Sequence, residues 1–355
     1  MKAVRLHAAG DLRVVDEPTP DVRDGHELVR VTAVGICGSD LHWFSHAAIG
    51  DAELGRPLVL GHEIAGVIEG GPRDGRRVAV DPAIPCRRCE VCLSGDTNLC
   101  PAIAFAGHGW LDGGLREYLA WPGDLLHPLP DALSDGDGAM LEPLGVALHA
   151  LDLGHLRVGM HVVVVGCGPI GLLLIQLSRL AGAGSIAAVE PLGHRRDAAR
   201  RAGADHAVAD EHDLTKVVTE DLPGPGFDLG FEVTDSGLAA QTAIAAVRPG
   251  ARIVLVGIPD DDSITFRASL ARRKGLTLVL SRRMKDTYPR AIRLVAAGHL
   301  DVASLVTGQF GLGSVNDAFS TAARRDGLKV MVHPTIPVSP RRATPAAPAR
   351  PDRHG

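Results

Sequence analysis

Hydrophobic residues follow two different patterns along the chain. Over the first 150 residues they form short runs broken by glycine, proline and aspartate, which predicts a β-rich region with many turns. From His161 onward, buried strands alternate with helical stretches, which predicts a parallel, doubly wound sheet. The change of pattern near residue 150 indicates two structural units.

The individual elements follow from the same patterns. Short apolar runs predict strands, and apolar residues that recur with a helical period predict helices. The predicted strands are 28–34, 58–60, 65–68, 77–80, 162–165, 186–190, 228–233, 252–256, 276–280 and 329–333, and the predicted helices are 170–181, 194–201, 238–247, 289–297 and 314–324. Proline, alanine and arginine dominate residues 335–355, which predicts a disordered tail.

Composition narrows the class of protein. A chain of 355 residues with 45% hydrophobic residues can bury a sizeable core, and its length favours two domains. The net charge is −5 and basic residues are scattered, which argues against a nucleic-acid partner. The chain contains no apolar run long enough to span a membrane. The N-terminus lacks the features of a signal peptide, so we expect a cytoplasmic protein.

A glycine motif follows the first strand of the alternating region. Residues 166–171 are Gly-Cys-Gly-Pro-Ile-Gly, placed between a buried strand and a helix, as in dinucleotide-binding sites. Glu190, at the end of the next strand, can accept hydrogen bonds from a ribose and repel a 2′-phosphate, which favours NAD. Arg195 and Arg196 leave NADP open, because an arginine can pair with that phosphate. A glycine-rich turn without a ligand is the structural alternative.

Four cysteines occur close together on one predicted loop. In a large chain without secretion signals, such a cluster indicates metal binding rather than disulfides. Four thiolates complete the tetrahedral shell of zinc and leave no position for a substrate, so the predicted site is structural. Its ligands are Cys86, Cys89, Cys92 and Cys100.

A second set of candidate ligands is dispersed. Cys37, His62 and Glu142 lie in three separate glycine- or proline-containing segments. Each has an ordinary alternative: a buried thiol, a hydrogen-bonded loop histidine and a solvated carboxylate. Cysteine, histidine and carboxylate together, with one position open, are what a catalytic zinc requires.

The order of these motifs resembles the zinc-containing medium-chain dehydrogenase/reductase superfamily, nearest to its sorbitol (polyol) dehydrogenase branch. The motifs are Gly-Ile-Cys-Gly-Ser-Asp-Leu-His (35–42), Gly-His-Glu (61–63), the four-cysteine loop, Glu-Pro-Leu (142–144) and the glycine motif. The resemblance spans residues 1–334. It implies an α/β fold with a GroES-like catalytic domain (1–150 and 284–334) and a Rossmann domain (151–283). It also implies a homodimer or homotetramer.

The resemblance assigns roles around the catalytic zinc. Cys37, His62 and Glu63 match zinc ligands of polyol enzymes, although in related alcohol dehydrogenases the glutamate lies behind the metal. Glu142 matches a residue that holds the zinc-bound water or ligates the metal. Ser39 and His42 match a relay that carries the alcohol proton to solvent.

Two further positions concern the substrate pocket. Arg283 matches an arginine that bonds substrate or the carboxylate at the zinc site, with Arg282 as the alternative. Trp43 stands where polyol enzymes often carry tyrosine, which leaves the size and polarity of the pocket open.

The residues assigned to the cofactor are Gly166, Gly168, Pro169, Ile170, Gly171, Glu190, Arg195, Val256, Gly257, Ile258 and Arg282.

The predicted activity is transfer of a hydride from a secondary alcohol to NAD, which gives a ketone. Glu142 and Arg283 add hydrogen-bonding groups beyond an ethanol pocket, so polyols, vicinal diols and cyclitols suit the site best. Threonine and aminocyclitol dehydrogenases share most of these motifs and remain alternatives. Rivals from other classes are a zinc-free, quinone-reductase-like or regulatory NAD-binding protein and a zinc-binding interaction module.

Overall fold

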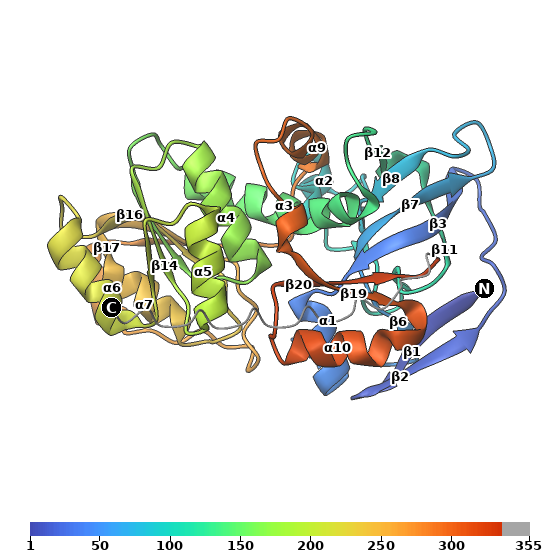
Figure 1. The fold of residues 1–355 in the computed structure, drawn as a ribbon, viewed down its shortest axis with the longest axis horizontal. Coiled ribbons are helices and arrows are strands. Elements are labelled where there is room, and N and C mark those ends of the chain that lie inside the picture. Colours follow the sequence, from blue (N-terminus) through green and yellow to red (C-terminus); the bar gives the residue numbers. More distant parts are fainter. Residues whose placement is uncertain (336–355) are drawn as a thin grey trace, which may run out of the picture.

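The computed structural model describes residues 1–335 and shows two lobes side by side (Figure 1). One lobe contains a parallel six-stranded sheet and the other a seven-stranded, mainly antiparallel sheet. The predicted α/β fold class, a β-rich lobe beside a doubly wound sheet, is confirmed. The predicted tail lies, apart from Thr335, outside the described residues.

The parallel sheet has the strand order of a doubly wound fold. Its order is β15-β14-β13-β16-β17-β18, with helices on its faces. The strands are β13 (His161–Val165), β14 (Ser185–Val189), β15 (His206–Val208), β16 (Phe227–Glu232), β17 (Val247–Leu255) and β18 (Thr277–Leu280); the helices are α4 (Pro169–Leu180), α5 (Gly193–Ala202), α6 (Glu211–Lys216), α7 (Ala239–Ala246) and α8 (Ala268–Lys274). The strand order reverses between β13 and β16, which is where such sheets bind ligands.

The β-rich lobe combines segments from both halves of the sequence. Its main sheet has the order β12-β8-β7-β3-β20-β19, with β11 also paired to β3. These strands are β3 (His26–Gly35), β7 (Glu63–Glu69), β8 (Arg77–Val80), β11 (Tyr118–Pro122), β12 (Leu126–Pro128), β19 (Val306–Gly311) and β20 (Lys329–His333). A smaller sheet pairs β1 (Lys2–Ala8) with β2 (Asp11–Asp16) and β6 (Leu58–Val59), and two hairpin-like pairs are β4 (Ala48–Ile49) with β5 (Ala52–Glu53) and β9 (Ala83–Ile84) with β10 (Ala104–Phe105).

Helix α3 (Asp135–Gly154) was not predicted. It carries four glycines and Pro143 in 20 residues, which are signals of turns rather than of a helix. The helix forms because Ser134 caps it and because its apolar residues bury themselves between the two sheets, both of which it contacts. The other helices are α1 (Gly38–His46), α2 (Glu90–Leu93), α9 (Tyr288–Ala296) and α10 (Val315–Ala323).

Most predicted elements lie within two residues of the observed ones. Strands β8 and β20 have the predicted bounds, whereas β17 begins five residues before the predicted start at 252. Within the described part of the chain, no helix is both long and apolar enough to cross a membrane. The boundaries of the two domains remain predictions.

Candidate functional site

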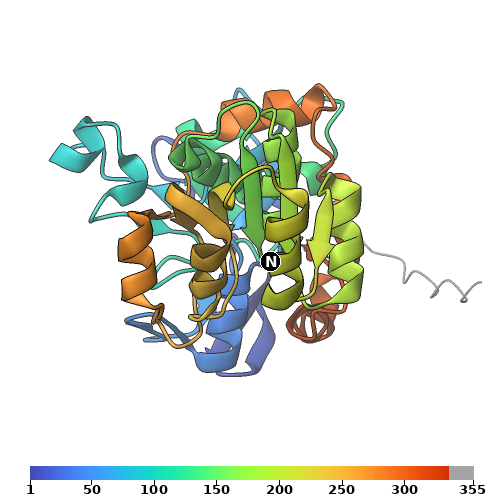
Figure 2. The same cartoon turned by 90° about the vertical axis from the view of Figure 1, so that its left-hand side faces the viewer.

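The four-cysteine loop stands out from the body of the molecule (Figure 2). Its sulfur atoms all lie within 4.8 Å of one another. Cys86 Sγ is 4.0 Å from Cys92 Sγ, and Cys89 Sγ is 4.0 Å from Cys100 Sγ. Zinc with four thiolates places its sulfurs about 3.8 Å apart, whereas a disulfide requires about 2 Å. These residues therefore form a four-cysteine cluster suited to structural zinc.

A second cluster joins Cys37, His62 and Glu63, whose ligand atoms lie within 4.8 Å of one another. Cys37 is the N-cap of α1, so its side chain lies at the N-terminal end of that helix. His62 and Glu63 stand at the start of β7, and both are buried. The sequence therefore folds into a Cys/His/Glu site whose soft and nitrogen donors suit zinc.

Asp40 holds the two ligand-bearing segments together. Its buried carboxylate accepts hydrogen bonds from the backbone N–H groups of Cys37 (2.9 Å) and Gly61 (3.0 Å). The same carboxylate lies 3.6 Å from His62 Nδ1. A carboxylate at this place fixes the orientation of the imidazole ring and leaves Nε2 for the metal. Asp40 belongs to the motif of residues 35–42, but nothing in the local sequence pattern assigned this role to it.

Glu63 has a cation of its own. Lys329 Nζ donates to Glu63 Oε1 (2.6 Å), to Oε2 (2.7 Å) and to the Ile36 carbonyl (3.0 Å). Both side chains are buried, and the pair outweighs the effect of burial, so the pKa of Lys329 lies above its usual value. Sequence analysis missed Lys329, because 266 residues separate it from its partner.

Glu142 lies in the middle of α3 and is also buried. It does not belong to the group of converging ligand atoms, which contains only Cys37, His62 and Glu63 among the neighbouring acids, cysteines and histidines described. Burial raises the pKa of Glu142 to about 7, His62 opposes this and Glu63 adds to it. A carboxyl group with this pKa can hold or release a proton near neutral pH.

Arg283 lies over the ring of Phe105, with Cζ 3.9 Å from the ring centroid. The Phe105 ring is in turn 5.2 Å from the ring of His62, so the guanidinium is close to the predicted metal. Burial, together with Arg282, lowers the pKa of Arg283 to about 10, and Glu142 opposes this shift. Its Nη1 atom is buried and lacks a protein hydrogen-bond partner in the described chain. Such a group is available to a ligand oxygen.

Trp43 and His108 lie beside Phe105, with the His108 ring 5.3 Å from that of Trp43 and 6.4 Å from that of Phe105. Trp43 is buried and its Nε1–H donates to His108 Nδ1 at 3.2 Å. Burial and the nearby Arg283 lower the pKa of His108 to about 4, so the ring is neutral and carries its proton on Nε2. Trp43, which stands where polyol enzymes often carry tyrosine, therefore has a hydrogen-bond acceptor in His108. Sequence analysis did not identify this histidine.

The predicted relay residues lie on α1. Ser39 Oγ is 3.5 Å from His62 Nε2, on the side where the metal is expected. His42 Nδ1 is 3.4 Å from Asp260 Oδ1, which belongs to the loop after β17. The two residues therefore extend from the zinc site toward the cofactor-binding lobe, although no hydrogen bond joins them among the described contacts.

The glycine motif has the geometry that its sequence predicts. Gly166 has φ of +100°, which favours glycine. A Cβ on Gly171 would lie 2.0 Å from the Gly166 carbonyl oxygen, so only glycine permits this approach of helix and strand. A Cβ on Gly168 would meet only Arg195 Nη1 at 3.9 Å. The second glycine therefore borders open space at the start of α4, which suits a pyrophosphate.

Glu190 directly follows β14, beside this turn. Its carboxylate accepts from the backbone N–H groups of Cys167 (2.9 Å) and Leu192 (3.0 Å), which fixes its position. Arg196 donates to the carbonyl oxygens of Glu190 (2.8 Å) and Pro191 (2.6 Å) and is thus committed to the backbone. Arg195 donates to the Gly327 carbonyl at 3.3 Å, and its Nε atom is buried without a protein partner. Arg195 therefore links the cofactor-binding lobe to the segment before β20 of the β-rich lobe.

The remaining cofactor candidates lie at the carboxyl ends of the central strands. Val256 and Gly257 donate to the Glu232 carbonyl at 2.8 and 3.2 Å, and Ile258 is 47% exposed. Ile170 is half-buried and Pro169 is the first residue of α4. The structure brings these residues to the sheet edge where the strand order reverses. Arg282 follows the last strand, and its carbonyl accepts a hydrogen bond from Asn98 at 2.9 Å.

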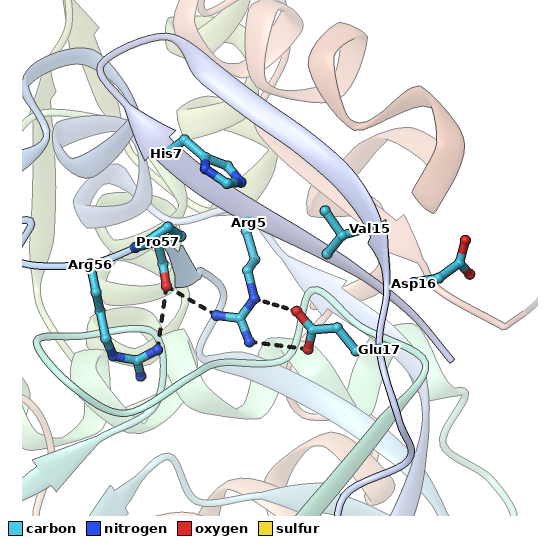
Figure 3. Close-up of a pocket in the computed structure, with 7 residues that line it drawn as sticks. All are labelled: Arg5, His7, Val15, Asp16, Glu17, Arg56 and Pro57. Carbon is cyan, nitrogen blue, oxygen red and sulfur yellow. Dashed lines mark hydrogen bonds and ion pairs between the residues drawn. The ribbon is translucent and has the colours of Figure 1, made fainter.

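A shallow hollow of about 370 Å³ lies elsewhere, on β1 and β2 (Figure 3). Its charged groups already have partners, because Arg5 binds Glu17 and Asp112 at 3.0 Å each. This hollow contains none of the predicted site residues. Its lining residues are Arg5, His7, Val15, Asp16, Glu17, Arg56 and Pro57.

Two protein families match the two lobes. The family described as "Alcohol dehydrogenase GroES-like domain" matches residues 23–131, and "Zinc-binding dehydrogenase" matches residues 169–297. The chain belongs to the zinc-binding alcohol dehydrogenases. The predicted superfamily and enzyme class are confirmed: the protein is an alcohol or polyol dehydrogenase with a nicotinamide cofactor.

Individual relatives agree with this membership. The chain is 35% identical to sorbitol dehydrogenase of Bacillus subtilis, over 94% of this chain and 97% of the relative. It is 36% identical to a probable D-xylulose reductase A of Aspergillus clavatus, over 92% and 95%. A crystal structure of an Escherichia coli protein described as a short chain alcohol dehydrogenase, in complex with NADH, is 28% identical, with a TM-score of 0.85 and coverage of 94% and 99%.

Proposed function

We propose that this enzyme oxidises a secondary alcohol of a polyol, vicinal diol or cyclitol to a ketone with NAD. The observation that carries the proposal is the position of two buried, hydrogen-bonding groups beside the metal cluster. Glu142 is close enough to His62 to interact with it electrostatically, and Arg283 lies on the Phe105 ring, which is 5.2 Å from the His62 ring; a simple ethanol pocket needs neither group. A substrate with several hydroxyl groups can use both groups at once.

The chain's own residues would bind and orient the substrate. Cys37 and His62 would hold the catalytic zinc. Lys329 balances the negative charge of the neighbouring Glu63 carboxylate. Glu142 accepts, and Arg283 donates, hydrogen bonds to hydroxyl groups next to the reacting carbon. When bound, zinc supplies a Lewis acid that lowers the pKa of the alcohol, and NAD supplies the acceptor of the hydride.

Ser39 and His42 would move the proton that the alcohol loses. Ser39 Oγ lies beside the ligand nitrogen of His62, so it can accept this proton at the start of the path. His42 faces Asp260 at the boundary of the two lobes and can release the proton to solvent. Loss of one proton and one hydride from the alcohol gives the ketone and leaves atoms and charge balanced.

The experiment for this proposal is a substrate panel. Polyols, vicinal diols, cyclitols and hydroxy-amino acids are each incubated with NAD and with NADP, and reduced cofactor is followed by absorbance. We expect the highest kcat/KM with a polyol, diol or cyclitol. A preference for L-threonine or an aminocyclitol would overturn the substrate class, and zinc-replete protein without any turnover would favour a binding function.

Cofactor choice has its own test. The Glu190 carboxylate is fixed by two backbone N–H groups at the end of β14, where it would meet the ribose hydroxyls and repel a 2′-phosphate. Glu190→Ser should lower kcat/KM for NAD and raise the relative use of NADP, helped by Arg195. Equal or better kcat/KM of the unmodified enzyme with NADP would contradict the proposal.

Location and assembly also belong to the proposal. The four-cysteine cluster needs reduced thiols, which the cytoplasm maintains. We infer a cytoplasmic homodimer or homotetramer, and sedimentation of the purified protein would test the oligomeric state.

A further inference from the structure

Residues 86–100, which carry the four cysteines and are called the four-cysteine lobe below, touch the segment that carries Arg283. Asn98, which lies between Asp96 and Cys100 of the lobe, is buried, and its Nδ2 donates to the Arg282 carbonyl at 2.9 Å. On the other side of Arg283, Lys285 Nζ forms an ion pair with Asp96 Oδ1 at 2.6 Å. The lobe therefore contacts this segment on both sides of the arginine, through the backbone carbonyl of Arg282 and through the side chain of Lys285.

The arginine needs such support, because its backbone is strained. Arg283 has φ of +55°, in the left-handed region that residues other than glycine rarely adopt. The hydrogen bond from buried Asn98 to the preceding carbonyl restricts the adjoining peptide group, and the exposed ion pair of Lys285 adds a weaker side-chain contact. The side chain is thereby directed onto Phe105, which follows the lobe as part of β10.

The segment also packs closely against α3, the helix that carries Glu142. A Cβ on Gly145 would lie 2.3 Å from Met284 Sδ and 2.6 Å from Thr287 Oγ1, so the segment uses the space that this glycine leaves. Asn98 Nδ2 is 3.5 Å from Nε2 of His149, which is on the same helix. Asn98 thus lies between the supports of both polar groups proposed to meet substrate.

We propose that Asn98 is a positioning residue for Arg283, through which the four-cysteine lobe sets the affinity of the proposed active site for its substrate. The assignment of Arg283 to substrate rests on the proposed function, whereas the support of its backbone by Asn98 does not. The lobe then has a second task besides its own folding. This second task is to order the segment around Arg283, which is not part of any strand of the two sheets.

The first test compares Asn98→Ala with Thr97→Ala, a matched change in the same turn whose side chain makes none of the described hydrogen bonds. We expect Asn98→Ala to raise the KM for the best polyol about tenfold or more, since small errors of placement weaken such contacts strongly. The kcat should change less, the KM for NAD should remain, and elemental analysis should still find both zinc ions. Loss of zinc, or an unchanged KM for the polyol, would overturn the proposal.

A double-mutant cycle separates positioning from other effects. If Asn98 acts through Arg283, Asn98→Ala should add little to the KM of an Arg283→Met enzyme. A full additional effect in that background would show that Asn98 acts elsewhere. Lys285→Met, on the exposed ion pair, should shift the polyol KM in the same direction by a smaller factor, and it keeps the test possible if Asn98→Ala does not fold.

Hydrogen exchange provides a readout that is independent of turnover. Peptides covering 282–288 should exchange faster in Asn98→Ala than in the unmodified protein or in Thr97→Ala. If no polyol is oxidised by the unmodified protein, the proposed function fails while this measurement still decides the role of Asn98. Unchanged exchange in this segment would refute the role.

Discussion

The two metal clusters of this enzyme are built in opposite ways. The ligands of the four-cysteine cluster come from one loop, whereas Cys37 and His62 come from separate elements that meet only in the folded chain. The loop has no core of its own, since Leu93 is 74% and Leu99 49% exposed. Around the second cluster, by contrast, buried side chains form the site. We therefore expect the four-cysteine loop to depend on its metal for folding. The site of Cys37 and His62 is instead formed by the fold of the protein around it.

The largest expected effect concerns the loop. Cys89→Ser should prevent stable folding of the lobe or of the protein, because the binding free energy of a structural zinc is folding free energy. Cys37→Ala is the matched change at the other cluster and should leave a folded, inactive protein with about one zinc. Yield, thermal unfolding and elemental analysis distinguish the two. A Cys89→Ser protein as stable as the unmodified one would break the comparison.

The next effect concerns Lys329. Lys329→Met would leave the buried Glu63 carboxylate without its cation and should cost about 3–5 kcal/mol in the free energy of unfolding. The pKa of Lys329 is raised in the folded protein, so the stabilisation that the lysine provides should be full at neutral pH and lost only as the pH rises through that raised value. Denaturant titrations at several pH values provide the measurement. Lys329→Met combined with Glu63→Gln should recover much of the loss; no recovery would disprove the pairing argument.

Glu142 decides how far the dispersed site extends. If the carboxylate holds water or substrate, Glu142→Gln should keep both zinc ions and lower kcat by about 10–100-fold. If it ligates the metal, the same variant should purify with less zinc. Steady-state kinetics and elemental analysis on one preparation separate these cases. A variant with full zinc and normal turnover would remove Glu142 from the mechanism.

The smallest effect tests the claim that the loop lacks a core. Leu93→Ser should change the free energy of unfolding by less than about 0.5 kcal/mol, as expected for an exposed position. Leu144→Ala, in the buried face of α3, should cost about 2–5 kcal/mol. Denaturant unfolding of both variants gives the comparison. A large loss with Leu93→Ser would show that apolar contacts, and not zinc alone, hold the lobe.

The same contrast explains what sequence could predict. Spacing alone revealed the four cysteines and the glycine motif, because their functional groups are neighbours along the chain. The chemistry of Cys37 and His62 made them candidate ligands of one metal, and the resemblance to a family supported that assignment. Local patterns could not reveal Lys329, whose partner lies far away in sequence, or α3, whose glycines and proline indicate turns until burial between two sheets overrides them.

Strand β20 has a consequence for the order of events during synthesis. It lies between β3 and β19 in the sheet of the β-rich lobe, and it also delivers Lys329 to Glu63. A ribosome must therefore polymerise the whole cofactor-binding lobe before the sheet begun by β3 can be completed. Such distant pairing slows folding and leaves a strand edge open in the meantime. Until β20 is synthesised, the open strand edge of the β-rich lobe can be bound by a chaperone. A pause in translation just before Lys329 would prolong the exposure of this edge.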